Sequence, residues 1–304
     1  FFFAPGVDQT GQAIDEPISL LGQTFEAPLR NGDVAALNWS QRLYQFPLGV
    51  FGIAIATAIF PALSAAASKF MGTNRGELEN EKQPGAYQDE ALDEFAKIVR
   101  HGLRLTVFIA LPASAGLILV RVPLARTVFE HGSFTSKDSL RVSFILAGYA
   151  SSVWAYSMTH TLTRAFYALK DATTPLKVSA AMVMLNLTLN LSLIWSLGAA
   201  GLAWSTAISA AGQVVLLLLL LRKRVAKPVD HTVIASWTRS MIATTVMAGA
   251  LFATSFFIED PLAMSWTASA GLLAGMVALG IAVYFVIAKL TKSEELGWLL
   301  RKKI

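Results

Sequence analysis

The longest stretch without a charged side chain constrains this sequence more than any other feature. Residues 178–221 contain no Asp, Glu, Lys or Arg over 44 consecutive positions, whereas one helix needs only about 20 apolar residues to cross the hydrocarbon core of a membrane. The segment Gly198-Ala199-Ala200-Gly201 lies near the middle of this stretch, and glycines in such a position mark turns. We therefore predict two membrane-spanning helices joined by a very tight turn.

The composition of the whole chain is typical of a membrane protein. Apolar residues make up 54% of the sequence, charged residues only 15%, and the mean hydropathy is +0.53, whereas a typical soluble domain has about 25% charged residues. The same search for charge-free stretches predicts an all-α integral membrane protein with seven transmembrane helices. The predicted spans are residues 37–68, 102–122, 142–166, 176–197, 202–222, 238–258 and 262–289.

The distribution of positive charge predicts the orientation of these spans. Seven spans divide the loops into two sets, and the set that includes the C-terminus carries 19 of the 25 Lys and Arg residues, against 6 in the other set. Loops rich in Lys and Arg stay on the cytoplasmic side of a membrane. We therefore expect a multi-pass protein with a cytoplasmic C-terminus and an N-terminal segment on the outer side.

The first 34 residues differ from the rest of the chain. The segment 6–33 is polar and rich in Pro and Gly, which predicts an extracytoplasmic insertion, with a short surface helix around residues 17–25. Residues 1–5 resemble the end of a truncated helix, and the chain does not begin with Met, so we expect it to be a piece of something longer. Residues 35–304 then form a single transmembrane lobe.

Several classes of function are disfavoured by the sequence. There are no cysteines, the four histidines are scattered, and no set of residues has metal-ligand or nucleophile spacing. No P-loop motif is present, so ATP-driven pumping is disfavoured. The basic residues follow the sides of the membrane rather than forming a patch, so we expect no nucleic-acid partner. We therefore predict a transporter rather than an enzyme, with no cofactor and no metal site.

Two arginines are candidates for binding an anionic ligand. Arg42 lies at the start of the first span, on the side that is poor in positive charge, and an arginine in a membrane is costly unless it faces water, a partner or an anion. Its guanidinium could hold phosphate oxygens in a bidentate contact, or it could be an interfacial anchor that reaches headgroups. Arg164, at a cytoplasmic helix end, either marks topology or attracts an anionic headgroup.

A second group of polar residues lies within the charge-free stretch. Asn186 and Asn190 are four residues apart and therefore share one helix face, and Thr206 lies in the next span. Their oxygens could hold a small cation or line a polar path. Hydrogen bonding between helices would explain the same residues.

Three motifs in order carry a resemblance to a known family. They are ALNWSQRLYQFPLGVFGIA at residues 36–54, EHGSFT at 130–135 and RAFYALKDATTP at 164–175. With the spans between them they resemble the MurJ (MviN) family of lipid II flippases, in the MOP exporter superfamily, whose members share a G-x-F-T loop and an R-x-F-Y-A-x-x-D-x-x-T-P segment. The resemblance extends from about residue 35 to the C-terminus.

The resemblance implies both a fold and a set of substrate-binding residues. Members of the family have fourteen transmembrane helices in two lobes around a cationic cavity, and this chain resembles the C-terminal half of such a transporter. Arg42 falls on an arginine expected to engage the pyrophosphate of lipid II, and Tyr44, Gln45 and Arg164 are implied as further substrate-binding residues. Gln45 occupies a position where some members have Glu.

The resemblance also implies an ion site, partners and a location. Asn186, Asn190 and Thr206 resemble a sodium site seen in parts of the family, although Asn190 replaces a residue that can be acidic. Transport would then be coupled to a Na+ or H+ gradient or to the membrane potential. The implied partners are lipid II, the phospholipid bilayer and the missing N-terminal lobe, in the bacterial inner membrane. Another MOP exporter of polyprenyl-linked polysaccharide or drugs, or a non-transporting membrane scaffold, are the alternatives.

Overall fold

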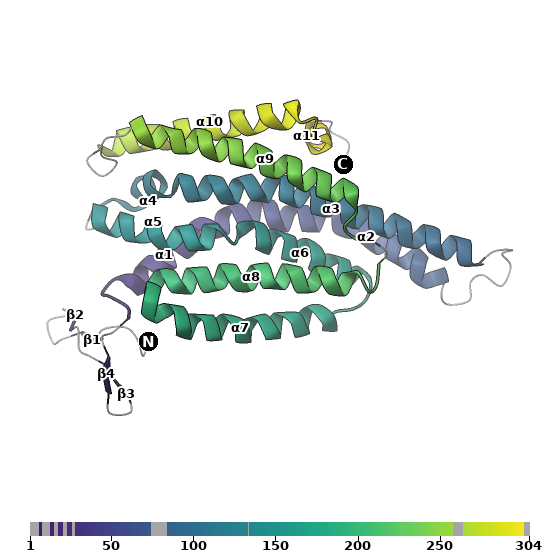
Figure 1. The fold of residues 1–304 in the computed structure, drawn as a ribbon, viewed down its shortest axis with the longest axis horizontal. Coiled ribbons are helices and arrows are strands. Elements are labelled where there is room, and N and C mark those ends of the chain that lie inside the picture. The colour runs from purple at the N-terminus through teal and green to yellow at the C-terminus, as the bar shows by residue number, and fades with distance from the viewer. Residues whose placement is uncertain are drawn as a thin grey trace.

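The protein is a bundle of long helices with two small hairpins near its N-terminus (Figure 1). The computed structural model describes residues 6–7, 13–14, 18–20, 23–25, 28–73, 84–132, 134–225, 227–257 and 264–300. The helices are α1 (Asp33–Pro47), α2 (Ala54–Thr73), α3 (Pro84–Leu119), α4 (Arg121–Phe129), α5 (Ser136–Ala150), α6 (Val153–Ala168), α7 (Thr173–Leu197), α8 (Ala199–Leu221), α9 (His231–Thr254), α10 (Trp266–Leu290) and α11 (Glu294–Leu300). A π-helical segment (Leu48–Ile53) joins α1 to α2, and a 3-10 turn (Ser255–Phe257) follows α9.

The N-terminal segment forms strands where a surface helix was predicted. Strand β1 (Gly6–Val7) pairs with β2 (Ala13–Ile14), and β3 (Ile18–Leu20) pairs antiparallel with β4 (Gln23–Phe25). The prediction of a short helix over 17–25 is therefore wrong, because Ile18, Thr24 and Phe25 are residue types that favour strands. The predicted end of a truncated helix, residues 1–5, lies outside the described residues.

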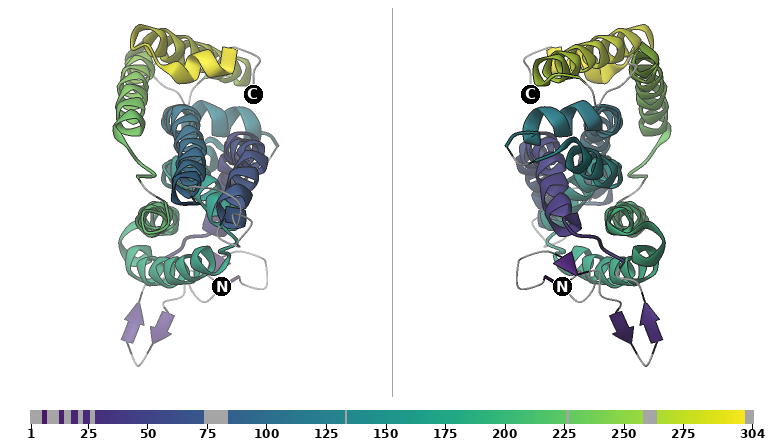
Figure 2. Two further views of the ribbon diagram at one scale, coloured as in Figure 1. Left: turned by 90° about the vertical axis from the view of Figure 1, so that its right-hand side faces the viewer. Right: turned by 90° about the vertical axis from the view of Figure 1, so that its left-hand side faces the viewer.

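The long helices lie side by side along one direction and form three groups (Figures 1 and 2). Helices α7 and α8 pack together on one side, α9 and α10 pack together on the other, and α1 to α6 lie between the two pairs. Helix α9 packs against α3, and α10 packs against α4. The predicted tight turn between α7 and α8 is confirmed, since Gly198 alone separates them at a φ of 57°, a conformation that glycine adopts without strain.

Five helical stretches are each long and apolar enough to cross a membrane. They are Asp33–Lys69, Glu90–Leu119, Thr173–Leu197, Ala199–Leu221 and Trp266–Leu290. Helix α9 begins seven residues before the predicted span 238–258, and α10 closely follows the range 262–289. The range 142–166 is divided between α5 and α6, with a turn at Ser151 and Ser152.

The break between α5 and α6 satisfies its own free backbone groups. Ser151 and Ser152 donate hydrogen bonds to the carbonyl groups of Gly148 and Tyr149, at 2.6 Å in each case. The hydroxyl of Ser114 in α3 donates to the carbonyl of Ala150, the last residue of α5. Serine side chains can replace helical hydrogen bonds in an apolar environment, so the break costs little.

Helix α3 continues through Pro112 for a similar reason. Proline has no N–H group, so the carbonyl four residues earlier, that of Phe108, lacks its helical partner. The hydroxyl of Tyr284 in α10 donates to this carbonyl at 2.6 Å. This hydrogen bond joins α10 to the middle of α3.

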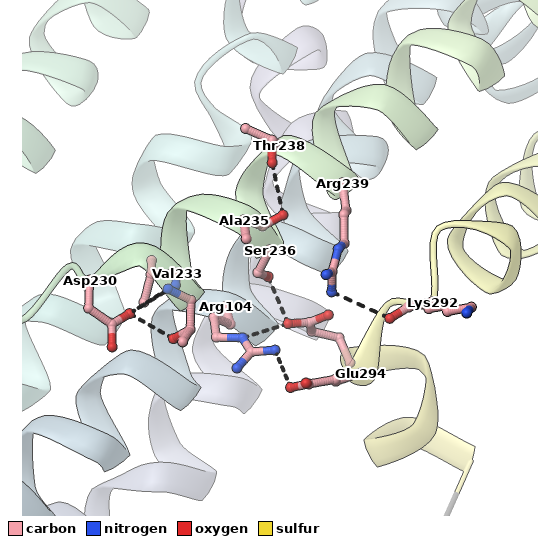
Figure 3. Close-up of polar contacts among 11 residues, drawn as sticks. Arg104, Asp230, Val233, Ala235, Ser236, Thr238, Arg239, Lys292 and Glu294 are labelled. Atoms are coloured by element: carbon pink, nitrogen blue, oxygen red, sulfur yellow. Dashed lines mark hydrogen bonds and ion pairs between the residues drawn. The ribbon is translucent and has the colours of Figure 1, made fainter.

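A partly buried ion-pair cluster attaches the last helix to the bundle (Figure 3). Arg104 in α3 forms two ion pairs: its Nε atom lies 2.7 Å from Oε1 of Glu295, and its Nη2 atom lies 2.6 Å from Oε2 of Glu294. The guanidinium also lies 4.6 Å from the ring centre of Trp298. Glu295 is completely buried and also accepts a hydrogen bond from Ser236 of α9. The cluster therefore holds α11 against both α3 and α9.

Candidate functional site

Arg42 lies on an exposed face of the first membrane-length helix. Exposed positions recur at helical spacing from α1 into the π-helical segment, and they include Arg42, Gln45, Phe46, Gly49, Val50 and Ile53. Arg42 forms no ion pair with any residue that the structure describes, and its guanidinium lies 5.0 Å from the ring centre of Trp39, one turn earlier. The helix therefore presents a free cation and a polar amide on an otherwise apolar face.

Tyr44 does not share this face. Its side chain is buried and stacks on Tyr149 of α5, with ring centres 5.0 Å apart and an angle of 13° between the planes, and it also lies near Tyr156 of α6. Successive residues of a helix point about 100° apart, so the neighbours Tyr44 and Gln45 have different surroundings. Of the predicted substrate-binding residues on α1, the structure brings Arg42 and Gln45 together and leaves Tyr44 in the core.

The π-helical segment begins directly after Pro47 and packs closely on α6. A Cβ atom at Gly52 would lie 2.7 Å from the hydroxyl and 3.1 Å from the Cα of Ser157, whereas a Cβ at Gly49 would meet nothing within 4 Å. Gly52 therefore allows the backbones of the two helices to approach, a common device between membrane helices. The exposed side of the same segment stays open next to Arg42.

Arg164 lies on α6, where α6 meets α2. It lies near the end of α6, half-buried, with its guanidinium 5.3 Å from the ring centre of Phe60 in α2. Phe60 is 18 positions beyond Arg42 on the α1–α2 rod, which corresponds to roughly 27 Å along a helix axis. The two arginines are therefore well separated along the rod and do not form one cluster.

Two of the three predicted ion-site residues line a small cavity, and the third, Asn190, is hydrogen-bonded to one of them. Asn186 and Thr206 line a hollow of about 220 Å³ between α6, α7 and α8, together with Tyr156, Ser179, Ser209 and Gln213. Asn190 donates to the side-chain oxygen of Asn186 at 3.0 Å, and Asn186 donates to Ser209 at 3.2 Å. Within the described part of the chain, no three His, Cys, Asp or Glu side chains gather as a metal site would require.

This cavity is neutral but rich in oxygen atoms. The side-chain oxygen of Asn190 is buried without a hydrogen bond from any described residue, while the Thr206 hydroxyl donates to the carbonyl of Leu202 at 2.9 Å. Amide, hydroxyl and carbonyl oxygens are ligands of hard cations. The NH2 group of Asn190 is used within α7, and that of Asn186 joins α7 to α8. Hydrogen bonding between helices and cation binding therefore both remain explanations of these residues.

Two features of the site were not predicted from the sequence. Trp39 lies under the guanidinium of Arg42 and precedes Arg42 by three positions. This spacing could have identified the pair, because residues three apart are neighbours on a helix. The pair of Arg126 and Glu130 also has a recognisable spacing, four residues, but the contacts of Glu130 with Ser136 and Ser139 join two helices and have no such local pattern. Glu130 accepts hydrogen bonds from Arg126 at 2.8 and 3.0 Å, from Ser136 at 2.9 Å and from Ser139 at 3.0 Å.

The helices and the site together define the class of protein. Several helices are long and apolar enough to cross a membrane, one exposes an arginine without an ion-pair partner among the described residues, and two others help to line a cavity with amide and hydroxyl groups. These features define a multi-pass membrane protein with polar groups on its long helices. The model of the lipid II flippase MurJ family matches residues 2–268, and this chain belongs to that family. Its place in a multi-pass inner-membrane protein follows from the family and from the apolar helices.

Individual relatives agree with the family match. The probable lipid II flippase MurJ of Vibrio cholerae is 32% identical over 275 residues, which cover 89% of this chain and 48% of the relative. The corresponding protein of Rhizobium meliloti is 31% identical over 273 residues, covering 89% and 47%. A solved structure of lipid II flippase MurJ in an inward closed conformation covers 85% of this chain and 47% of its own, with a TM-score of 0.63 and 23% identity. The chain therefore has a MurJ-like fold and spans about half the length of the relatives it matches.

Proposed function

We propose that this chain is the C-terminal half of a lipid II flippase, which moves the polyprenyl-pyrophosphate-linked precursor of peptidoglycan across the inner membrane for cell-wall synthesis. The observation that carries the proposal is Arg42, an exposed arginine without an ion-pair partner among the described residues, on the first membrane-length helix. The names of the relatives support the identity of the substrate.

The chemistry of the substrate explains why such an arginine is needed. Lipid II carries charged phosphates and a sugar-peptide headgroup, which would lose their hydration in hydrocarbon at a prohibitive cost. A guanidinium offers bidentate contacts to phosphate oxygens and remains charged inside a protein. Arg42, with the amide of Gln45 one turn further on, would replace part of that lost hydration.

The position of Arg164 supports a second contact on the path. Arg42 and Arg164 are well separated along the α1–α2 rod, so a pyrophosphate that moves along the rod would meet one arginine and then the other. Seven spans with a cytoplasmic C-terminus would place Arg164 on the cytoplasmic side, where loading occurs, and Arg42 on the outer side. A second lobe would close the exposed face of α1 and α2 and rock against this one.

Coupling would come from an ion gradient or the membrane potential. The cavity beside Asn186, Asn190 and Thr206 offers oxygen ligands suited to Na+, and protons or the membrane potential are the other candidate sources. A Na+ dependence of transport that disappears in Asn186→Leu, with unchanged protein levels, would assign the ion to this cavity.

The experiment that tests the proposal is depletion of the protein from its host, followed by mass spectrometry of lipid-linked intermediates. We expect lipid II to accumulate, and the wild-type gene, but not an Arg42→Ala version, to restore growth. Lys137→Ala, another exposed cation on the outer side of the predicted topology, serves as the control and should restore growth.

The same experiment separates the two alternatives. Accumulation of a polyprenyl-linked polysaccharide with normal lipid II would indicate a different exporter of the same superfamily. Loss of growth without accumulation of any lipid-linked intermediate would indicate a membrane scaffold. The unpaired Arg42 favours transport, because a scaffold has no need of an exposed cation at that position.

A further inference from the structure

Two motifs that are far apart in the sequence meet beside Arg42. The Trp39 ring, which lies under the Arg42 guanidinium at 5.0 Å, packs on Phe129 at the end of α4, with ring centres 4.9 Å apart. Phe129 in turn packs on Phe134, with ring centres 5.9 Å apart. Phe134 belongs to the EHGSFT motif, so an unbroken series of three rings leads from that motif to the arginine.

The start of this series is held firmly in place. Glu130, directly after α4, accepts hydrogen bonds from Arg126 in α4 and from Ser136 and Ser139 in α5. Arg126 is itself buried and donates to the carbonyl of Met264 at 2.8 Å. The two helices on either side of Phe134 are therefore fixed to each other and to the start of α10.

The backbone next to Phe134 is fixed by two further features. Gly132 has a φ of 63°, a conformation that residues with a side chain rarely adopt. Thr135 and Asp138 form a reciprocal capping box at the start of α5, which satisfies the backbone N–H groups of both residues. Gly132 and Thr135 of the motif thus fix the backbone on either side of Phe134, and the Phe134 ring packs on Phe129.

We propose that this motif positions Arg42 through the rings of Phe134, Phe129 and Trp39, so that the guanidinium is already oriented when a pyrophosphate group arrives. Trp39, Phe129 and Phe134 are positioning residues in this account, and none of them contacts the ligand. The inference rests on the proposed function, because it gives Arg42 a phosphate to bind.

The physical need for such support follows from the side chain itself. An exposed arginine has many rotamers, and fixing it on binding costs conformational entropy. Tryptophan is the best aromatic partner for a cation, and its ring restricts the guanidinium without using the N–H groups that phosphate oxygens require. The Phe129 and Phe134 rings fix the Trp39 ring in turn, in the way that supporting residues hold a functional side chain in a productive geometry.

The test is a mutant cycle on the protein expressed from its complete coding sequence and reconstituted in lipid nanodiscs. Binding of undecaprenyl pyrophosphate is measured for Trp39→Leu, Trp39→Phe and Phe134→Leu, each with Arg42 present and with Arg42→Ala. With Arg42 present, we expect Trp39→Leu to weaken binding about tenfold and Phe134→Leu about threefold, and Trp39→Phe to retain most of the affinity. With Arg42→Ala, none of the three should weaken binding further. Trp204→Leu, which removes an exposed tryptophan of α8, is the control and should bind as wild type.

The outcomes distinguish this inference from the proposed function. If the losses caused by Trp39→Leu and Phe134→Leu are equally large with Arg42→Ala, the rings only pack α1 against α4 and the inference is overturned. If Arg42→Ala abolishes binding while Trp39→Leu and Phe134→Leu bind normally, the inference fails and the proposed function stands. If Arg42→Ala binds as wild type, both fail. Thermal unfolding of each variant shows which ones fold. If Trp39→Leu does not fold, the binding measured for Phe134→Leu tests the inference in its place.

Discussion

Tyr44 and Gln45 are adjacent in the sequence but have opposite surroundings, and this difference gives a direct test at the scale of single residues. Tyr44 is buried and stacked on Tyr149, and its hydroxyl has no hydrogen bond with a described residue. We therefore expect Tyr44→Phe to support growth and fold normally, because the stacked ring is retained. Tyr44→Ala should lower the free energy of unfolding by about 3–5 kcal/mol, since it leaves a cavity.

Thermal unfolding of the purified protein and complementation of growth check this expectation. Gln45→Leu is the matched variant on the exposed face, and it should unfold like the wild type. If Tyr44→Phe folded normally but failed to support growth, packing alone would not explain Tyr44. The hydroxyl would then contact substrate, as the family resemblance implies.

The sequence could identify the important residues of α1 but not their directions. Arg42 stands out because an arginine inside a span on the outer side is unusual, and Gln45 follows it on the same face. The resemblance alone grouped Tyr44 with them, since a motif gives neighbours in sequence without saying which face each occupies. The support from Phe129 and Phe134 depends on contacts between helices, which no local pattern records.

At the scale of helices, the two glycines of the π-helical segment should respond differently to the same change. Gly52→Ala places a methyl group 2.7 Å from the Ser157 hydroxyl and 3.1 Å from its Cα, whereas Gly49→Ala meets nothing within 4 Å. We expect Gly52→Ala to destabilise the protein by about 1–3 kcal/mol and Gly49→Ala to have little effect. Equal unfolding temperatures for the two variants would show that α1–α2 and α6 do not pack as described.

The attachment of α11 gives a second expectation at this scale. Arg104→Met leaves the fully buried Glu295 carboxylate without its cation (Figure 3), which should cost about 3–5 kcal/mol of unfolding free energy. Arg104→Met combined with Glu295→Leu should recover most of this loss, because no buried charge remains. The control is Lys69→Met, which breaks an exposed ion pair with Glu94 and should cost less than about 1 kcal/mol.

The junction between α4 and α5 should make stability depend on pH. The hydrogen bonds from Arg126, and then those from Ser136 and Ser139, hold the pKa of Glu130 below its ordinary value of about 4.5. A carboxyl group whose pKa is lowered by folding stabilises the protein above the unfolded-state pKa, and this contribution is lost as the pH falls through the folded-state value.

Glu130→Gln should therefore be less stable than the wild type at pH 7, by about 1–3 kcal/mol. The difference in unfolding temperature should shrink as the pH is lowered below the ordinary glutamate pKa of about 4.5, and a pH series of thermal unfolding measures it. A constant difference from pH 7 to pH 3 would mean that the ionised form of Glu130 contributes nothing.

The helices themselves were largely predictable, whereas their irregularities were not. Charge-free stretches and the glycine between α7 and α8 indicated most of the long helices, because a membrane demands long apolar segments. The turn at Ser151 and Ser152 and the π-helical segment after Pro47 depend on hydrogen bonds and close contacts from neighbouring helices. The hairpin over 18–25 was mistaken for a helix, since so short a segment shows no clear period.

For the whole molecule, the alternation of positive charge predicts an orientation that single cysteines can test. The sequence contains no cysteine, so Lys137→Cys and Arg222→Cys can each be labelled without background. Both positions are exposed, and the predicted topology places them on opposite sides of the membrane. A membrane-impermeant maleimide applied to intact spheroplasts should label the cysteine at 137, and should label the one at 222 only after permeabilisation. The reverse pattern would invert the orientation.

The central claim is that Arg42 binds the pyrophosphate of lipid II during transport. The most direct measurement follows the appearance of the lipid II headgroup on the outer face of the membrane, in cells that depend on Arg42→Ala or Arg42→Lys expressed from the complete coding sequence. We expect no appearance for Arg42→Ala and a reduced rate for Arg42→Lys, which keeps the charge but loses the bidentate contact. A wild-type rate of appearance for Arg42→Ala, at equal protein levels, would contradict the central claim.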